Sequence, residues 1–243
     1  MNKRQNIRKA IIIGMFFTFP VTIAFMSPAM PIIYGFGGVV LGATIMFLFL
    51  FLIALVLGRA FCGFVCPGGG LSECLMRIND KGLKNSKLRM IKYFVWVFLV
   101  VATILSFISA GGISEVNFFA GLEEGWIFLF APYRYAIYFF VLFGGLLLQL
   151  IWGKRSFCQC ICWIAPFMII GTKASDWLRL PRLRLRADAN SCIGCKQCSK
   201  KCPMSLDVKT MVETANMKNS ECILCGECVD ICPKKSISYA LNR

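Results

Sequence analysis

The chain has no histidine among its 243 residues. Imidazole ligates many haem groups, Rieske clusters and many zinc and copper sites. We therefore expect no haem, and any metal chemistry here must use cysteine thiolates, with methionine or carboxylate as minor ligands.

Acidic residues are also scarce, because only 12 Asp and Glu stand against 27 Lys and Arg, which gives a net charge of +15. A basic balance of this size can indicate a nucleic-acid partner. Here the basic residues flank long apolar segments, so we expect no nucleic acid. The hydrophobic share of 58% is above that of soluble domains and favours a membrane protein.

Cysteine, by contrast, is abundant and grouped, with 14 residues. The pattern C-x2-C-x2-C-x3-C-P occurs twice between Cys192 and Pro233, and this is the signature of bacterial ferredoxins with two [4Fe–4S] clusters. The fourth cysteine of each run ligates the other cluster. The expected ligands are Cys192, Cys195, Cys198 and Cys232 for cluster 1, and Cys222, Cys225, Cys228 and Cys202 for cluster 2.

Zinc and disulfides are the alternatives for these eight cysteines. Zinc sites usually pair two C-x2-C knuckles around one ion, which fits two complete four-cysteine runs less well. Disulfides need an oxidising compartment, and nothing else in the chain looks secreted.

Four apolar segments predict membrane spans at residues 11–26, 37–57, 90–109 and 133–152, since a span needs about 20 apolar residues. The first segment is also compatible with a signal peptide, but it has no convincing cleavage site and hydrophobicity resumes at once. We favour a retained helix that is broken by Pro28 and Pro31.

Lysine and arginine in the loops predict the orientation. They are frequent at the N-terminus and in segments 59–92 and 154–186, and absent from the loops near Pro28 and at 111–131. We therefore expect a multi-pass protein of the cytoplasmic membrane with both termini and the ferredoxin domain in the cytoplasm, where thiols stay reduced.

The expected domains are a four-span domain at 1–175, a basic linker at 176–190 and a ferredoxin domain of α+β class at 191–243. Within the linker, residues 178–186 alternate apolar and basic side chains. We favour a linker along the membrane surface, with a short paired strand as the alternative.

An internal repeat adds a third cysteine group. R-A-F-C-G-F-V-C at 59–66 matches R-S-F-C-Q-C-I-C at 155–162 with an offset of 96 residues. Each copy follows a pair of spans, so the membrane domain reads as two parallel repeats, 1–85 and 86–175, related by an axis along the membrane normal. Such an axis brings both C-x3-C pairs to the same face, and i, i+4 spacing puts both sulfurs of a pair on one helix side.

This arrangement predicts a further thiolate-bound metal centre, iron–sulfur or another metal, with Cys160 as a substitute ligand. Small buried cysteines at helix ends are the simpler interpretation, but two pairs in equivalent positions favour a metal site. The expected ligands are Cys62, Cys66, Cys158 and Cys162.

With these motifs the chain resembles the NapH/MauN-type membrane ferredoxins, which have four spans, two C-x3-C-P motifs and a C-terminal two-cluster ferredoxin domain. Residues 61–67, F-C-G-F-V-C-P, match the first motif, whereas Trp163 stands where the second has proline. The resemblance implies electron transfer between the quinone pool and a redox protein. The same membrane core recurs in proteins of nitrous oxide reductase maturation and copper-oxidase assembly.

We therefore expect an electron-transfer subunit of an oxidoreductase that has no self-contained catalytic residues. Its partners are the lipid bilayer and a redox protein (a ferredoxin, a flavoprotein or a reductase subunit), and the sequence leaves a homo- or hetero-oligomer open. The alternatives are a maturation factor that reduces a metal or cofactor for another enzyme, and a docking anchor of a larger complex.

A quinol site needs an apolar cleft and a proton acceptor. The candidate clefts are the kink at Pro28–Pro31 and the loop 115–134. Without histidine, the candidate acceptors are Glu115, Glu123 and Glu124.

Overall fold

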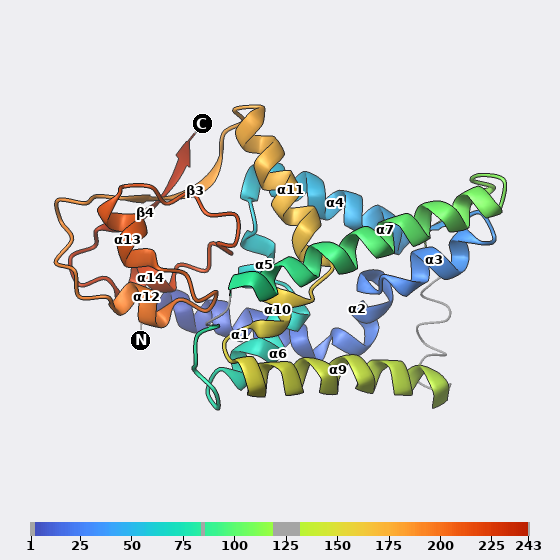
Figure 1. Cartoon of the computed structure of the whole chain (residues 1–243), viewed down its shortest axis with the longest axis horizontal. Coiled ribbons are helices and arrows are strands. Elements are labelled where there is room, and N and C mark those ends of the chain that lie inside the picture. Colours follow the sequence, from blue (N-terminus) through green and yellow to red (C-terminus); the bar gives the residue numbers. More distant parts are fainter. Residues whose placement is uncertain (1–2, 84–85, 119–131, 243) are drawn as a thin grey trace.

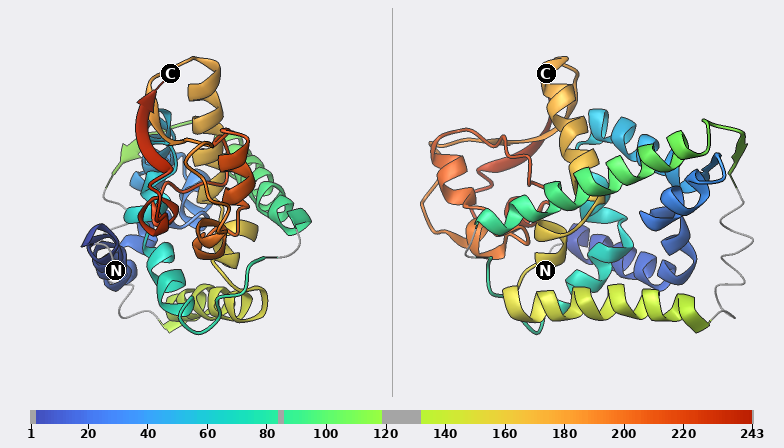
Figure 2. Two further views of the ribbon diagram at one scale, coloured as in Figure 1. Left: turned by 90° about the vertical axis from the view of Figure 1, so that its left-hand side faces the viewer. Right: turned by 45° about the vertical axis from the view of Figure 1, so that its right-hand side comes forward.

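The computed structural model describes residues 3–83, 86–118 and 132–242. A bundle of helices is covered at one end by a smaller C-terminal part, which both Figure 1 and the right-hand view of Figure 2 show. The long helices α7 (Ile91–Ser109) and α9 (Pro132–Trp152) run from that end to the opposite end.

The other elements are short. In the bundle they are α1 (Lys3–Phe17), α2 (Phe19–Met26), α3 (Ala29–Gly35), β1 (Val39–Leu41), α4 (Gly42–Leu57), α5 (Ala60–Phe64), α6 (Pro67–Leu75), η1 (Ser86–Met90), β2 (Glu115–Asn117), α10 (Ser156–Cys160) and α11 (Ile164–Trp177). In the C-terminal part they are β3 (Arg182–Ala187), α12 (Gln197–Lys201), α13 (Val208–Glu213), α14 (Glu227–Ile231) and β4 (Ile237–Asn242).

The first expected span, 11–26, is wrong as a single helix. α1 starts at Lys3 and ends at Phe17, and α2 starts at Phe19 with Pro20 in its first turn. Proline is tolerated in the first turn of a helix but removes a hydrogen bond in its interior, so the chain breaks here.

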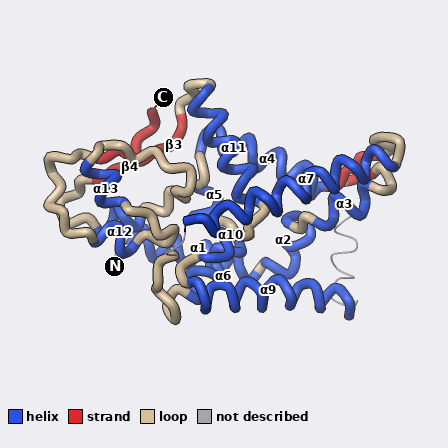
Figure 3. The backbone as a smooth tube through the Cα atoms, in the orientation of Figure 1, coloured by secondary structure: helices blue, strands red, loops and turns tan. Residues whose placement is uncertain are grey.

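The second expected span starts later than its apolar sequence. α4 begins at Gly42, and the preceding Val39–Leu41 form β1, which pairs in parallel with β2. This small sheet lies at the end of the molecule opposite the C-terminal part (Figure 3).

One helical segment of the described chain, Lys87–Ser109, is long and apolar enough to cross a bilayer. Its mean hydropathy is 2.2 and only 11% of its most apolar window is buried, unlike a helix in a protein core. Gly42–Leu57 and Leu142–Trp152 are apolar but shorter. The third expected span is thus confirmed by length and composition, and the four-span arrangement stays a prediction.

The basic stretch after α11 forms a strand, so its interpretation as a surface linker is wrong for Arg182–Ala187. β3 pairs antiparallel with β4, and Leu185, opposite Tyr239, is buried in the core of the C-terminal part. Side chains alternate between the two faces of a strand, so the arginines between the leucines lie on the other face. The fold of the C-terminal part therefore begins before residue 191.

Two hydrophobic clusters meet at the junction between the bundle and the C-terminal part. One contains Cys202, Cys225 and Cys228, and the other joins α4 to α11 around Leu50 and Met168. Cys62 packs against both clusters. The first C-x3-C motif therefore stands at the boundary between the two parts.

Candidate functional site

Two small cavities in the C-terminal part gather the ferredoxin-type cysteines. Cys192, Cys195, Cys198 and Cys232 line one cavity, and Cys202, Cys222, Cys225 and Cys228 line the other. Each cavity thus combines three cysteines of one run with the fourth cysteine of the other run, which is the partition that the sequence predicts.

The bends on either side of the second cysteine of each run shape these cavities. Gly194 and Lys196 flank Cys195, Leu224 and Gly226 flank Cys225, and all four have positive φ values between 52° and 74°. The two runs thus share one backbone path, although a glycine occupies only one of the two bends in each.

Each cavity offers four cysteine thiols, which is the ligand set of a cubane that takes one thiolate at each iron. In the described ranges no three cysteine or carboxylate side chains converge closely enough to hold one metal ion. Burial raises the pKa of Cys222 to about 11 and that of Cys225 to about 12, while backbone N–H groups of Leu224 and Glu227 oppose the rise. Bound iron would hold such thiols as thiolates.

The two C-x3-C pairs have the same local geometry, but it is not the helix face that i, i+4 spacing suggests. Cys62 lies in α5, whereas Cys66 is extended at the end of the next turn, with φ −62° and ψ 121°. Because a residue before proline avoids the helical region, Pro67 favours this conformation. The Cys66 N–H donates to the Phe61 carbonyl at 3.0 Å, and the Cys162 N–H donates to the Phe157 carbonyl at 3.0 Å.

Trp163 therefore keeps the turn that Pro67 makes in the first motif. In each copy the second cysteine is followed by a helix whose first N–H groups reach its sulfur: Gly69 for Cys66, and Ile164 and Ala165 for Cys162. Helix N-termini stabilise thiolates. Each motif thus places the sulfur of its second cysteine at the start of a helix.

The structure places these four cysteines near enough to one another to affect their ionisation. Cys66 interacts electrostatically with Cys62, Cys158 and Cys162, and Cys162 interacts with Cys158 and Cys62. Burial raises the pKa of Cys66 well above its usual value and that of Cys162 to about 12, and the neighbouring thiols add to both shifts. We call Cys62, Cys66, Cys158 and Cys162 the motif quartet.

Cys160 is not brought to the whole quartet. It is fully buried, and its electrostatic neighbours are Lys92, Arg89 and Glu221 together with Cys158. Residues two apart on a helix do not face the same side. The substitute-ligand role expected for Cys160 gains no support from this arrangement.

The motif quartet lies against the second ferredoxin-type loop. A Cβ added to Gly63 would lie 2.4 Å from the Ile223 carbonyl oxygen and 3.4 Å from the Cys225 Cα. Only a glycine lets the two backbones approach so closely. The first motif and a cysteine of the second cavity are therefore in direct contact, although 162 residues separate Gly63 from Cys225.

Buried ion pairs hold this junction, and the sequence analysis assigned them no role. Glu73 of α6 contacts Arg8 at 2.7 Å and Arg155 at 3.3 Å. Burial works against ionisation of Glu73, but Arg155 and Arg8 outweigh it and hold the pKa of this carboxyl below its usual range. Arg8 also contacts Glu227 of α14 at 3.0 Å and so ties α1 to the C-terminal part.

A second buried pair uses the other arginine of the repeat. Arg59 contacts Glu221 at 3.0 Å, and Lys92 of α7 contacts the second oxygen of the same carboxylate. Arg59 and Arg155 are equivalent in the 96-residue repeat, and both are at most 1% exposed. Their equivalence in the repeat could have marked both arginines as structurally important. It could not have identified their carboxylate partners, which lie far away in the chain.

The remaining expected residues lie away from the junction. Lys196 and Lys234 are exposed and line the first cavity. Glu115 is exposed on β2 at the far end of the bundle. Glu123 and Glu124 lie outside the described residues.

Comparisons with known proteins agree with the cysteine sites. A family model described as a 4Fe-4S dicluster domain matches residues 184–233, and one described as a 4Fe-4S binding domain matches twice, at 39–86 and 133–181. An uncharacterized protein of Methanocaldococcus jannaschii is 28% identical over 99% of this chain and 89% of its own length.

Two named relatives are also similar. The ferredoxin-type protein NapH of Haemophilus influenzae is 25% identical over 82% of this chain and 67% of its own length. A component of the ion-translocating oxidoreductase complex of Methanosarcina acetivorans is 44% identical over 19% of this chain and 17% of its own length. No solved structure matches the chain.

Proposed function

Because the chain belongs to the NapH-type [4Fe–4S] ferredoxin proteins and is an iron–sulfur electron-transfer protein, we propose that it passes electrons between a membrane redox donor and a cytoplasmic protein partner. The two cysteine sets of the C-terminal part hold two [4Fe–4S] clusters, and the motif quartet holds a third centre. Bound clusters supply the one-electron chemistry, while the protein positions them and adjusts their potentials.

The contact of Gly63 with Ile223 and Cys225 carries this proposal. A relay needs its centres close together in a fixed arrangement, and here the first motif packs against the loop that ends in Cys225. Arg155 supports the same order, because it interacts electrostatically with Cys66 and Cys158 of the quartet and also with Cys225 of the second cavity. The quartet would thus connect the bundle to cluster 2.

The test is the double substitution Cys62→Ser and Cys158→Ser in the full chain. We expect the metal content to fall to that of two cubanes, about eight irons, and quinol-driven reduction of the clusters to stop. Dithionite should still reduce the two ferredoxin clusters, because it reaches them from the aqueous side. Iron analysis and visible spectroscopy measure both effects.

The matched control is Cys74→Ser with Cys160→Ser, which also removes two thiols from the bundle but leaves the quartet intact. It should keep the full metal content and quinol-driven reduction. The proposal fails if the double variant of the quartet keeps both as well. Copper or zinc in place of the third iron–sulfur centre would favour a role in metal-site maturation.

We also propose that an apolar cavity of about 450 Å³ between α3, α4, α7 and α11 takes the quinone ring. Pro28 and Pro31 line it at the kink that the sequence singles out, and Trp163, next to Cys162, lines it as well. Two polar atoms of lining residues, Thr44 Oγ1 and Trp96 Nε1, are buried without a hydrogen-bond partner among the described residues. A quinone carbonyl would satisfy such donors.

Trp96→Phe tests this assignment, because it keeps an aromatic ring and removes the N–H group. We expect quinol to bind roughly tenfold more weakly, the effect of about one lost hydrogen bond, with unchanged reduction by dithionite. Trp177→Phe is the control, because Trp177 is 83% exposed and lies outside the cavity. Equal quinol affinity in both variants would contradict the assignment.

A further inference from the structure

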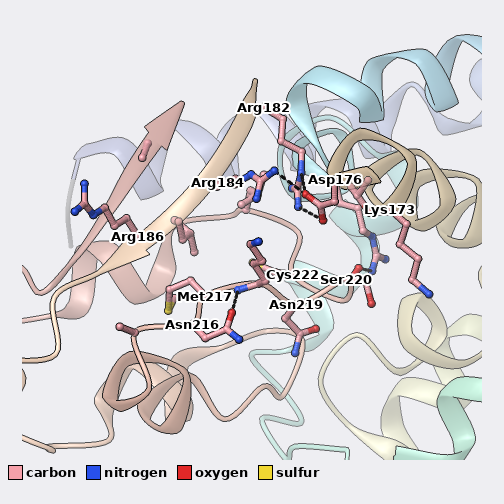
Figure 4. Close-up of a pocket in the computed structure, with 17 residues that line it drawn as sticks. Lys173, Asp176, Arg182, Arg184, Arg186, Asn216, Met217, Asn219, Ser220 and Cys222 are labelled. Carbon is pink, nitrogen blue, oxygen red and sulfur yellow. Dashed lines mark hydrogen bonds and ion pairs between the residues drawn. The ribbon is translucent and has the colours of Figure 1, made fainter. Parts of the chain in front are cut away.

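A second large cavity lies on the cytoplasmic side of the proposed membrane domain, where the last turn of α11, strand β3 and the loop before Cys222 meet. Its volume is about 420 Å³. Figure 4 shows Arg182 and Arg184 directed at Asp176 on one side, with Cys222 and Asn219 on the facing side. We call this cavity, lined by Arg59, Asp176, β3 and the loop 215–222, the junction pocket.

The junction pocket is strongly basic. A single carboxylate, that of Asp176, lines it, and the cations are Lys173, Arg182, Arg184, Arg186 and Lys218, together with Arg59, which is already paired with Glu221. Asp176 is already shared, because Arg184 contacts it at 2.7 Å and Arg182 at 3.0 Å. One carboxylate therefore leaves this pair of guanidinium groups with a net positive charge.

The register of the β3–β4 pair explains the density of charge. Directly paired residues share a face of the sheet, and the residues opposite Arg182, Arg184 and Arg186 are Asn242, Ala240 and Ser238. None of the three is acidic, and two of them are small. The arginine face of β3 is thus left without cross-strand neutralisation, while its leucine face fills the core.

Hydrogen-bond donors also exceed acceptors here. The Nε atom of Arg184 is buried and has no acceptor within the part of the chain that the structure describes. Arg59 is 1% exposed and its charge is matched by Glu221, so it does not add to this excess. A buried unpaired donor is costly, and an anion bound in the pocket would supply acceptor oxygens.

We propose that the junction pocket binds a phosphate-bearing anion. Guanidinium groups match phosphate oxygens in paired, planar contacts, and a phosphate group carries enough negative charge to face several arginines at once. The pocket is too large for a halide and is enclosed by two parts of the chain, which suits a small anion rather than a protein surface.

Two sources of phosphate fit this chemistry. A free phosphate compound would enter from the aqueous side. The headgroup of an acidic phospholipid would enter from the membrane, because Arg59 follows directly on the end of the apolar helix α4. The experiment separates these two sources.

The pocket also reaches a thiol of the proposed relay, because Cys222 lines it. Negative charge beside a cluster lowers its reduction potential. A bound phosphate would therefore make cluster 2 a stronger reductant. This consequence rests on the proposed cluster assignment, whereas phosphate binding itself does not.

The test uses the full-length protein with its clusters, first in neutral detergent titrated with inorganic pyrophosphate by calorimetry. It is then placed in nanodiscs of phosphatidylcholine with or without phosphatidylglycerol, and retained lipid is counted by native mass spectrometry. Saturable binding of pyrophosphate indicates a free phosphate compound, and selective retention of phosphatidylglycerol indicates a lipid headgroup. Saturable binding of neither ligand overturns the proposal.

Three variants distinguish the pocket from general surface charge. Arg184→Gln should weaken binding at least tenfold, and Lys201→Gln, an equal charge loss at an exposed residue of α12, should leave it unchanged. Asp176→Asn should strengthen binding, because it removes the competing carboxylate, and a gain in affinity cannot result from misfolding. Equal losses in Arg184→Gln and Lys201→Gln would refute a specific pocket.

The redox readout is separate. Saturating pyrophosphate or phosphatidylglycerol should shift the midpoint potential of one cluster to more negative values in the wild type, and should not shift it in Arg184→Gln. Binding without a shift of the midpoint potential would still support the anion site, but it would contradict the assignment of Cys222 to cluster 2. Failure of the relay test with normal binding would count against the proposed function alone.

Discussion

At the scale of single residues, the junction depends on arginines whose charge is matched by carboxylates from distant segments. Arg59 and Arg155 occupy equivalent positions, yet Arg59 pairs with Glu221 of the C-terminal part and Arg155 with Glu73 of α6. Removing one member of a buried pair leaves an unpaired charge and is strongly destabilising. These ion pairs therefore help to hold the cysteine groups in a fixed arrangement.

Gly63 gives the sharpest prediction at this scale. In Gly63→Ala the added methyl group would lie 2.4 Å from the Ile223 carbonyl oxygen, so the two backbones must separate. Overpacking of this kind costs roughly 1–3 kcal/mol. We expect a lower Tm of the holoprotein and slower electron transfer from the quartet to the ferredoxin clusters, with unchanged iron content, measured by thermal melting and stopped-flow spectroscopy.

Gly14→Ala is the control, because nothing lies within 4 Å of the position where its Cβ would be. It should leave the transfer rate unchanged and should not lower the Tm, because alanine favours a helix more than glycine does. If Gly63→Ala has the same Tm and the same transfer rate as Gly14→Ala, the close approach of the two backbones is not needed for stability or for electron transfer.

At the scale of elements, the same turn appears twice. α5 and α10 each end two residues before a cysteine whose N–H donates five residues back, to Phe61 or Phe157. Trp163 replaces the proline of the first copy but donates its Nε1–H to the Met26 carbonyl at 2.8 Å. This bond ties the second motif to the end of α2, a tie that proline could not make.

The strand β3 gives the prediction at this scale. A fragment of residues 180–243 should bind about eight irons and melt cooperatively, because it contains both strands of the sheet and the buried Leu185. A fragment of residues 191–243 lacks β3, and loss of one buried leucine alone costs about 2–5 kcal/mol. It should reconstitute poorly in iron analysis and circular dichroism. Equal stability of both fragments would contradict the role of β3.

At the scale of the whole molecule, the C-terminal part forms one end and β1 and β2 lie at the other, with α7 and α9 extending between them (Figure 3). Lys92, Lys154 and Arg155 are buried near the C-terminal part. The expectation from the loop lysines and arginines that this end faces the cytoplasm stays a prediction.

We therefore predict that a tag at the C-terminus is accessible only from the cytoplasmic side. A tag inserted after Gly112, in the turn between α7 and β2, should be accessible only from the other side, and it serves as the matched control. Protease protection in right-side-out and inverted vesicles measures both. Exposure of both tags on one side would contradict the proposed orientation.

The spacing of the cysteines was enough to predict the partition, because in a two-cluster run the fourth cysteine serves the other cluster. The structure places the two ferredoxin sets around two cavities as that spacing predicts. The 96-residue repeat likewise identified the motif quartet and both arginines. Helix bounds were less predictable, since Pro20 divides the first apolar run and Val39–Leu41 leave the second to pair with β2.

The sequence alone therefore determined the kind of metal ligand that this protein can offer. It has cysteine but no histidine, two four-cysteine runs and a duplicated C-x3-C motif. Tertiary structure alone decided where these groups stand relative to one another. The contact of Gly63 with Cys225, the pairing of Glu221 with Arg59 and the arginine-lined junction pocket each join segments that are distant in the chain. The physical reason is that packing between such segments depends on the complete arrangement of backbone and burial, which no local pattern of residues encodes.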